Sequence, residues 1–258
     1  MKKVNLFIFI FTFISLNVYS QNKKVISLAP NITDILYYLN YEENIIAVDR
    51  FSKKPENAII IGDLISINYE KLIKIKPDII FLTKEQKKIA DKIKKISNIK
   101  IHIIDIKKIS DFNPEISKIS KVLNIKNKSI IFAPIISISK IIDKKKTVLV
   151  IIDRNKKKLN NIFVVGNNNF INDYLAVLNL KNIIKSPNYP KINIEKIISL
   201  NPDIIIDLTH GADIKIWNKY QFINSVKNNK IYKASVKLTV PSPDIINNII
   251  EMKNKLWN

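Results

Sequence analysis

The sequence contains no cysteine, and its 258 residues include only three glycines and two histidines. Without cysteine we expect no disulfide, no thiolate ligand for a metal ion and no lipid on an N-terminal cysteine. The glycines are Gly62, Gly166 and Gly211, and their wide spacing excludes a phosphate-binding loop and a dinucleotide-binding glycine motif. These absences remove the commonest nucleotide-dependent and thiol-dependent chemistries.

Catalytic and metal-binding residues are equally scarce. The chain has no Gly-x-Ser-x-Gly motif for a nucleophilic serine. A site of two histidines and a carboxylate would need His102 and His210 to converge from different halves of the chain, and a receptor for bare zinc or manganese needs several such ligands. His102 lies inside an apolar strand pattern, where we expect it to pack. The sequence therefore predicts a protein that is not an enzyme, with catalysis as a remote alternative.

The only long apolar run lies at the beginning of the chain. Lys2 and Lys3 precede an apolar stretch over residues 4–14, and Val18-Tyr19-Ser20 suits cleavage before Gln21. The stretch is shorter than the roughly 20 residues that span a bilayer, which disfavours a membrane anchor. We expect a cleavable signal peptide at residues 1–20 and an exported, periplasmic protein that is not lipidated.

Acidic residues are outnumbered: 43 lysines and arginines face 22 aspartates and glutamates, for a formal charge of +21. Such an excess is typical of proteins that bind nucleic acid or anionic membranes. Here, however, lysine is dispersed among isoleucine and asparagine, and no basic run is interleaved with aromatic residues as in a nucleic-acid platform. We predict no nucleic-acid partner and keep a basic exported adaptor as an alternative. A basic surface also favours an anionic ligand.

Apolar runs and helical periodicity alternate along the rest of the chain. The expected strands lie near residues 24–28, 44–49, 78–82, 99–106, 146–152, 162–166, 203–208 and 230–234, and the expected helices near 31–40, 68–76, 84–98, 169–180, 193–201 and 243–257. Alternating strands and helices indicate parallel sheets with helices on both faces. The predicted fold class is α/β, with two doubly wound lobes joined by a single interdomain helix and a ligand cleft between them.

The expected boundaries follow from this pattern. An N-terminal lobe covers residues 21–126, a connecting helix 127–143 and a C-terminal lobe 144–258. The connecting helix rests on isoleucines at helical intervals. Pro134 lies within it and either kinks the helix or marks its beginning, and both readings stay open.

One segment is nearly repeated: "INYEKLIKIKPDII" at residues 67–80 resembles "INIEKIISLNPDII" at 192–205. A duplicated helix-proline-strand unit explains most of the repeat. Glu70 and Glu195 fall in the first turns of their helices, where the helix dipole favours a carboxylate by only about 0.3–1 kcal/mol. Two equivalent glutamates also offer paired docking points to a two-fold symmetric partner that presents arginines.

Several stretches in this order resemble the periplasmic binding-protein family that serves ABC importers of cobalamin, ferric siderophores and haem. They are "VISLAPNITDILYYL", "IIAVDRFSKKPENA", "IGDLISINYEKLIKIKPDIIFLT", "VVGNNNFINDYLAVLNLKNII" and "INIEKIISLNPDIII". The resemblance runs from about Lys24 to the end of the chain and is strongest in 24–83 and 163–207.

The resemblance implies a function without chemistry. The protein would capture a metal-chelate in the cleft, with cobalamin or a related corrinoid favoured and a ferric siderophore or haem as the alternative. It would be a monomer without a cofactor of its own, although its ligand would contain cobalt or iron. Its partner would be an ABC permease dimer in the inner membrane, which the family contacts through lobe-surface glutamates that match Glu70 and Glu195.

The candidate cleft residues follow strands, because ligands of such sheets bind at the carboxyl ends of strands. They are Pro30, Asn31, Arg50, Phe51, Gly62, Asp63, Asn168, Phe170, His210 and Lys237. Phe51 matches a position where similar cobalamin binders often carry a tyrosine, with ordinary burial as the alternative. Arg50 suits an anionic chelate, and His210 suits an axial metal ligand. Tyr189 and Trp217 are candidate rim aromatics, although Trp217 also fits simple packing. The segment around Lys237 lacks the aromatic residue of some cobalamin binders, which weakens that choice of ligand.

Overall fold

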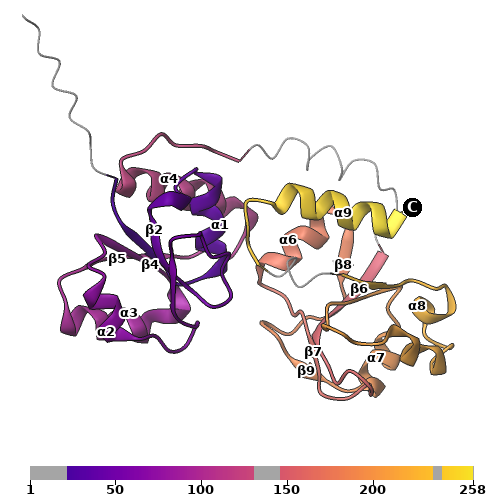
Figure 1. Ribbon diagram of the computed structural model, residues 1–258. Helices are drawn as coiled ribbons and strands as arrows, with labels where there is room; N and C mark the ends of the chain where they lie inside the picture. Colours follow the sequence, from indigo (N-terminus) through magenta and orange to yellow (C-terminus); the bar gives the residue numbers. More distant parts are fainter. Residues whose placement is uncertain (1–21, 131–145, 235–239, 258) are drawn as a thin grey trace, which may run out of the picture.

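The computed structural model describes residues 22–130, 146–234 and 240–257, which form two α/β lobes placed side by side (Figure 1). The first lobe is built on a five-stranded sheet in the order β3-β2-β1-β4-β5, in which all neighbours are parallel. Its strands are β1 (Val25–Ser27), β2 (Ile45–Asp49), β3 (Ile59–Gly62), β4 (Ile79–Thr83) and β5 (Lys100–Ile104). Its helices are α1 (Pro30–Tyr38), α2 (Tyr69–Lys74), α3 (Lys87–Ile96) and α4 (Phe112–Leu123), with short 3-10 turns η1 (Glu42–Asn44), η2 (Lys84–Gln86) and η3 (Ile109–Asp111).

Both faces of this sheet are covered, because alternate strand residues point to opposite sides. Val25, Val48 and Phe81 pack in the same cluster as α1 and α4, whereas Ile26, Ala47 and Leu82 pack with α2 and α3. A strand buried on both faces reads as a continuous apolar run, which is the pattern of β4.

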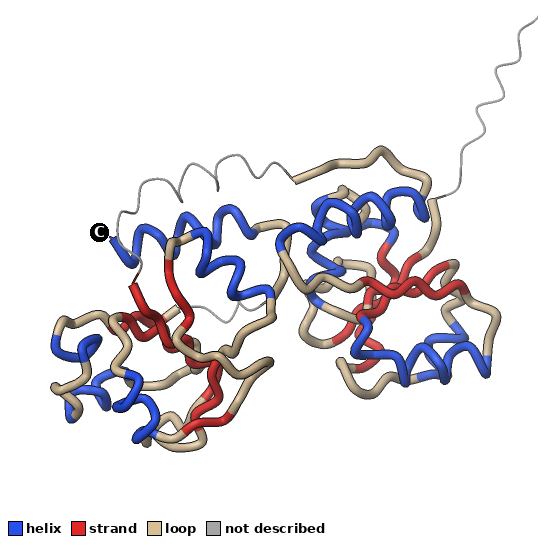
Figure 2. Tube along the Cα trace, turned by 180° about the vertical axis from the view of Figure 1, so that it is seen from behind, coloured by secondary structure: helices blue, strands red, loops and turns tan. Residues whose placement is uncertain are grey.

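The second lobe contains a six-stranded sheet in the order β11-β10-β6-β7-β9, with β8 also paired to β6. Its strands are β6 (Lys146–Asp153), β7 (Ile162–Val164), β8 (Leu180–Asn182), β9 (Lys191–Ile192), β10 (Ile204–Asp207) and β11 (Ile231–Lys233). Its helices are α6 (Phe170–Val177), α7 (Ile194–Leu200), α8 (Asn224–Lys227) and α9 (Ile245–Trp257), with one 3-10 segment, η4 (Ile214–Lys219). Figure 2 shows the same division from behind, with helices on both sides of each sheet.

The predicted fold class is confirmed, with one difference in the second sheet. There β7 runs antiparallel to β6 and β9 rather than parallel. Only eight residues, 154–161, connect β6 to β7. So short a connection makes a hairpin, whereas a parallel neighbour needs a crossover of a dozen or more residues. The connecting helix predicted at 127–143, with Pro134, and the signal peptide lie largely or wholly outside the described residues, and the lobe boundaries stay predictions.

The two lobes touch through η3 and α4 on one side and α6 on the other. The rings of Phe112 and Phe170 lie 5.9 Å apart, and the backbone N–H of Ile109 donates to Asp173 Oδ2 at 2.8 Å. Side chains of both lobes therefore share one apolar cluster. In the described ranges, no helix combines the length and the apolar character needed to cross a membrane.

Candidate functional site

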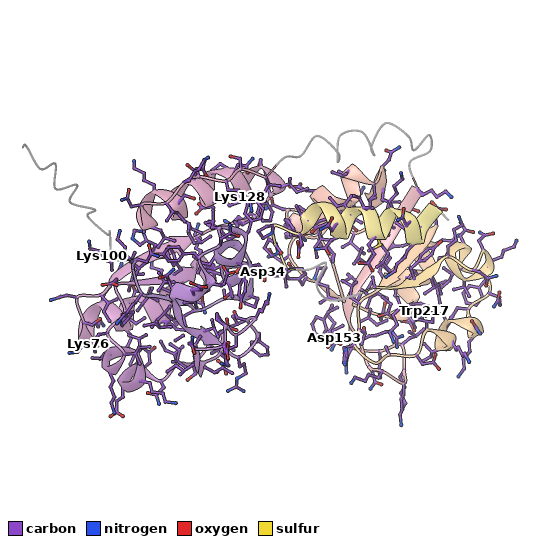
Figure 3. All side chains as sticks on the ribbon, turned by 45° about the horizontal axis from the view of Figure 1, so that its top comes forward. Asp34, Lys76, Lys100, Lys128, Asp153 and Trp217 are labelled. Atoms are coloured by element: carbon purple, nitrogen blue, oxygen red, sulfur yellow. The ribbon has the colours of Figure 1, made fainter. Side chains whose placement is uncertain are left out.

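A cleft lies where the carboxyl ends of the first sheet meet the segment that leads into α9. It consists of two adjoining hollows of about 520 and 360 Å³ that share Pro30 and Val240. The first lobe supplies Ala29, Pro30, Asn31, Asp34, Phe51, Lys53, Leu64, Thr83, Glu85, Gln86, Ile104, Asp105 and Ile106, and the other wall consists of Val240, Pro241, Ser242, Asp244 and Asn248. Figure 3 labels Asp34 at the junction of the lobes. The volume lies in the range of small-molecule sites, about 300–1,000 Å³.

The turn between β1 and α1 forms the floor of the cleft. Pro30 begins α1, where a proline costs nothing because the first helical N–H has no partner within the helix. The hydroxyl of Thr33 bonds Ser27 Oγ at 2.8 Å and lies 3.2 Å from the carbonyl oxygen of Ala29. These bonds fix the turn and leave Pro30 and Asn31 against the cleft, as the carboxyl-end rule predicts.

The loop after β2 presents Phe51. The fully buried carboxylate of Asp49 accepts the N–H of Phe51 at 2.8 Å and the hydroxyl of Ser52. Thr33 donates to Ser52 Oγ at 3.0 Å, which ties this loop to α1. The Phe51 side chain itself is 62% exposed. Ordinary burial therefore does not explain this phenylalanine, which a buried polar network holds at the wall of an open cleft.

Arg50, Gly62 and Asp63 form the neighbouring rim. The Arg50 guanidinium lies 3.7 Å from the Asp63 carboxylate. The backbone N–H groups of Ile65 and Ser66 also donate to this carboxylate, and these bonds hold the pKa of Asp63 below its ordinary value, with a smaller contribution from Arg50. A side chain at Gly62 would lie 2.2 Å from the carbonyl oxygen of Ser66. This tight loop leaves Leu64 and Ile65 41% and 88% exposed beside the cleft.

The described candidates from the second lobe do not line these hollows. Phe170 is only 5% exposed and packs against Phe112 and against Tyr174, whose ring lies 4.7 Å away. Asn168 has a left-handed backbone (φ 59°) in the loop before α6, and His210 is exposed in the loop after β10. Lys237 lies outside the described residues. The cleft therefore gathers Pro30 and Asn31 with Phe51, and Phe170 belongs to the contact between the lobes.

The other two aromatic candidates differ from each other. Trp217 is fully buried in the core of the second lobe, which is the packing alternative. Tyr189 is half exposed, and its pKa is raised by burial and by the Glu85 carboxylate of the first lobe. Tyr189 therefore lies near Glu85, which lines the cleft, although Tyr189 itself is not among the lining residues.

Sequence reasoning missed several lining side chains. Glu85 and Asp105 follow β4 and β5 directly, so the carboxyl-end rule could have found them. Ser242, Asp244 and Asn248 carry no such signal, because the path of the chain into α9 brings them to the cleft. Among the described lining residues, four carboxylates, Asp34, Glu85, Asp105 and Asp244, accompany one lysine, Lys53. The basic excess of the chain is therefore not found in this lining.

Lys84 and Lys107 lie at the edge of the cleft, and Lys53 packs on a tyrosine ring. Lys84 Nζ and Lys107 Nζ lie 3.2 and 3.5 Å from Asp105 Oδ2, and Lys53 Nζ lies 4.0 Å from the centre of the Tyr37 ring. Over the described ranges, no group of three histidine, aspartate or glutamate side chains is arranged to hold a metal ion.

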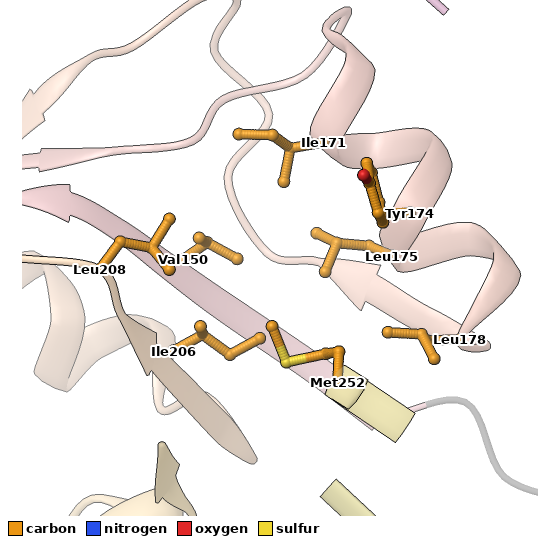
Figure 4. A pocket seen from close by; sticks show the side chains of 8 residues that line it. All are labelled: Val150, Ile171, Tyr174, Leu175, Leu178, Ile206, Leu208 and Met252. Atoms are coloured by element: carbon orange, nitrogen blue, oxygen red, sulfur yellow. The ribbon is translucent and has the colours of Figure 1, made fainter. Parts of the chain in front are cut away.

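A separate apolar void lies inside the second lobe (Figure 4). It is lined by Val150, Ile206 and Leu208 of the sheet side and by Ile171, Tyr174, Leu175, Leu178 and Met252 of the helices. Its volume is about 20 Å³, close to the smallest space that holds one water molecule. Burial raises the pKa of Tyr174 in this environment. We regard the void as a packing gap of the core.

The two repeated glutamates lie on corresponding helices. Asn68 and Asn193 cap α2 and α7, and Glu70 and Glu195 follow two residues later in exposed positions. Figures 1 and 2 place α2 and α3, like α7 and α8, on the side of their sheets opposite to α4 and α9. The two helices that carry these glutamates, α2 and α7, therefore lie on the same side of the molecule.

No protein-family model matches the sequence. A curated relative, the uncharacterized ABC transporter substrate-binding lipoprotein YvrC of Bacillus subtilis (strain 168), is 25% identical over an alignment of 257 positions that covers 92% of this chain and 81% of the relative. A solved structure of a possible iron-binding (periplasmic solute-binding) protein from Staphylococcus epidermidis ATCC 12228 is also 25% identical, with a TM-score of 0.77 over 92% of this chain and all of that one.

Two solved structures with lower identity share the fold. The periplasmic vitamin B12 binding protein BtuF of Vibrio cholerae is 17% identical with a TM-score of 0.73, covering 91% of this chain and 96% of its own. The periplasmic heme binding protein HutB of Vibrio cholerae is 16% identical with a TM-score of 0.79, covering 91% and 98%. These structures show the fold, and the similarity to YvrC confirms the predicted resemblance to the binding proteins of ABC importers.

The curated relative contradicts the expected location. We predicted a periplasmic protein without lipid, whereas YvrC is a lipoprotein. The prediction treated the missing cysteine and the short apolar leader as sufficient to decide how the protein is retained. A relative that carries lipid shows that proteins similar to this chain are not always free of a lipid anchor. The prediction of an unlipidated protein was therefore wrong.

Proposed function

We propose that this protein is the substrate-binding component of an ABC importer, which captures a metal-chelate in the cleft between its lobes and delivers it to a membrane permease. The observation that carries the proposal is Phe51, an exposed aromatic ring that the buried Asp49 holds at the cleft wall. Opposite it lie Ser242 and Asn248 from the segment leading into α9. YvrC is an ABC transporter substrate-binding lipoprotein, and the Staphylococcus epidermidis protein is a possible periplasmic solute-binding protein, which supports capture without chemistry.

A corrinoid is the ligand we favour. The cleft offers apolar contact from Pro30, Phe51 and Leu64 and amides from Asn31 and Asn248. An apolar surface with a few placed polar groups is typical of small-molecule sites. A planar macrocycle edged with amides, as in cobalamin, would match this combination.

A haem or a ferric siderophore is the alternative. Arg50, Lys84 and Lys107 stand at the rim with more than half of each side chain exposed, and such cations would suit the carboxylates of an anionic chelate. Solved structures of similar fold include binders of vitamin B12 and of heme. The two ligand classes therefore have to be separated by experiment.

The proposed docking surface uses one carboxylate from each lobe. Glu70 and Glu195 would each contact an arginine of one permease subunit, because the two repeated helices present them in equivalent, exposed positions. Charge complementarity of this kind sets register and the rate of encounter more than affinity. The permease would thus recognise the protein with either lobe facing either subunit.

The first experiment is an absorbance titration of the purified protein with cyanocobalamin, haemin and a panel of ferric siderophores of different charge. Saturable binding of cyanocobalamin with one molecule per chain is the expected result. Saturable binding of haemin or a siderophore instead would support the alternative ligand. If none of these chelates binds, the proposed function is wrong, whatever the fold.

A further inference from the structure

The fold gathers lysines on the outer side of α2 and α3. Eight exposed lysines come from these helices and the residues that end α2: Lys71, Lys74, Lys76, Lys87, Lys88, Lys92, Lys94 and Lys95. We call them the basic face. The exposed acids of the same helices are Glu70 and Asp91. Lysines that look dispersed in the sequence are therefore concentrated on one surface.

These lysines form no salt bridges with described acids, whereas two lysines on the opposite side of the molecule do. On α4, Lys118 Nζ lies 3.1 Å from Glu115, and on α9 Lys255 Nζ lies 2.6 Å from Glu251. No lysine of the basic face forms a salt bridge with a described residue. Lys92 lies over the Tyr69 ring, 4.1 Å from its centre. The positive charge of this face therefore remains available to an external partner.

Exposed isoleucines accompany the lysines. Ile73 of α2 and Ile96 of α3 are 42% and 44% exposed. Surfaces that lie on membranes combine lysines with apolar side chains that reach the boundary between headgroups and acyl chains. A nucleic-acid platform would instead offer free aromatic rings for stacking bases, and Tyr69 is covered by Lys92. The composition of the face favours a lipid surface over nucleic acid.

We propose that the basic face binds the anionic headgroups of a membrane surface. The lysines would meet the negative charge and the exposed isoleucines would reach the headgroup boundary. Glu70 lies on this face, and α7 with Glu195 lies on the same side of the molecule (Figures 1 and 2). Contact with lipid would therefore bring both carboxylates close to a membrane-embedded partner. The proposal adds to the proposed function but does not depend on which chelate is bound.

The test is sedimentation of the protein without its predicted signal peptide, residues 21–258, with lipid vesicles. Vesicles containing phosphatidylglycerol should bind it at about 0.1 M salt and release it at about 1 M, where the Debye length falls from about 10 to about 3 Å. Vesicles of phosphatidylcholine alone should not bind. Each lysine near an anionic surface contributes about fivefold in affinity. The triple variant Lys88→Gln, Lys94→Gln and Lys95→Gln should therefore bind about a hundredfold more weakly.

A matched control removes three exposed charges elsewhere: Lys108→Gln, Lys121→Gln and Lys126→Gln, on and around α4. We expect this variant to keep its vesicle affinity within about threefold, because α4 covers the face of the sheet opposite to α2 and α3. Both variants should retain the thermal unfolding and chelate titration of the parent, which separates failure here from failure of the proposed function. An equal loss in both variants would mean that only net charge matters and would overturn the proposal. Binding to a DNA duplex that exceeds vesicle binding at the same salt would also overturn it.

Discussion

Asp78 and Asp203 perform the same task in the two lobes: each carboxylate accepts a hydrogen bond from the backbone N–H where the central strand of its sheet begins. Asp78 Oδ2 lies 2.8 Å from Lys24 N, and Asp203 Oδ2 lies 2.9 Å from Thr147 N. Both aspartates follow the proline that ends the repeated helix. The repeated Pro-Asp pair is therefore explained by folding.

The asparagines of the repeat are also explained by folding, whereas the glutamates are not. The side-chain oxygens of Asn68 and Asn193 accept the N–H of Lys71 and Lys196 at 2.8 and 2.9 Å, which caps the two helices. Glu70 and Glu195, in contrast, form no salt bridge with any residue in the described ranges. Their structural contribution is therefore limited to the weak attraction between a carboxylate and a helix N-terminus. Their exposure leaves room for an external partner.

Replacing both glutamates should therefore separate transport from binding. We expect the double variant Glu70→Ala and Glu195→Ala to lower uptake at least about tenfold, because docking on the permease would lose a charge pair in each lobe. Its affinity for the chelate should stay within about twofold, since neither side chain lines the cleft. Uptake in permease-containing vesicles and titration of the purified protein measure the two effects.

The control for this prediction is the double variant Glu43→Ala and Glu251→Ala, which removes one exposed glutamate from each lobe away from α2 and α7. Its uptake should equal that of the parent. A loss of chelate affinity in the Glu70 and Glu195 variant that matches its loss of uptake would contradict a docking role.

Phe51→Ala should weaken chelate binding at least about tenfold, because aromatic side chains in a cleft contribute disproportionately to affinity. The free energy of unfolding should change by less than about 0.5 kcal/mol, since Phe51 is 62% exposed. Phe222→Ala is the matched control: this phenylalanine is 61% exposed but does not line the cleft. Equal titration curves for the two variants would exclude Phe51 from the binding site.

Much of the fold was predictable because apolar periodicity and proline stops are local. The helix-proline-strand units, the buried strands and the packed position of His102, whose ring centre lies 5.8 Å from that of Phe81, follow from neighbouring residues. The short edge strand β3 (Ile59–Gly62) was missed, as were α4, β8 and β9. The two residues of β9 are too few for a period to emerge, whereas the helical spacing of Ile116, Ile119 and Leu123 in α4 was present and was overlooked.

The cleft was predictable only on one side. Pro30, Asn31 and Phe51 follow strands of a parallel sheet, so topology alone places them at one edge. The opposite wall at Ser242 and Asp244 depends on where the chain turns into α9, which no local pattern encodes. Phe170 also follows a strand, but it packs against Phe112 of the other lobe instead of lining the cleft. Contacts between lobes cannot be read from the local sequence.

The second lobe depends on a buried ion pair that the sequence did not reveal. Arg154 Nε lies 2.7 Å from Asp207 Oδ2, and the two side chains are 0% and 1% exposed. The guanidinium also donates to the carbonyl oxygens of Asn155 and Asp213 at 2.9 and 3.0 Å. Asp207→Ala should lower the free energy of unfolding by about 3–5 kcal/mol, because it leaves a buried charge unpaired.

Urea denaturation measures this cost, with Glu251→Ala as the control. Glu251 pairs with Lys255 at 2.6 Å but is 59% exposed, so its loss should cost less than about 1 kcal/mol. The double variant Arg154→Met and Asp207→Leu should recover most of the stability, because apolar side chains of similar size often replace a buried pair without loss. A double variant as unstable as Asp207→Ala would show that the hydrogen bonds to Asn155 and Asp213 are themselves required.

We expect the protein to lose stability in mild acid because of His102. Burial lowers the pKa of His102 below its ordinary value, and the nearby charges of Lys118, Lys23 and Lys100 lower it further. The folded protein therefore favours the neutral imidazole. As the pH falls below about 6.5, the unfolded chain takes up a proton that the folded chain resists, so the free energy of unfolding decreases. The decrease ends once the pH is below the folded pKa.

The chain offers its own control, because His210 is the other histidine and is exposed. Urea denaturation between about pH 7.5 and about pH 5.5 avoids the titration of most carboxylates. Over this window the parent and His210→Gln should lose stability equally, whereas His102→Gln should lose less. If His102→Gln keeps the full pH dependence of stability, another group causes that dependence, and burial does not lower the pKa of His102.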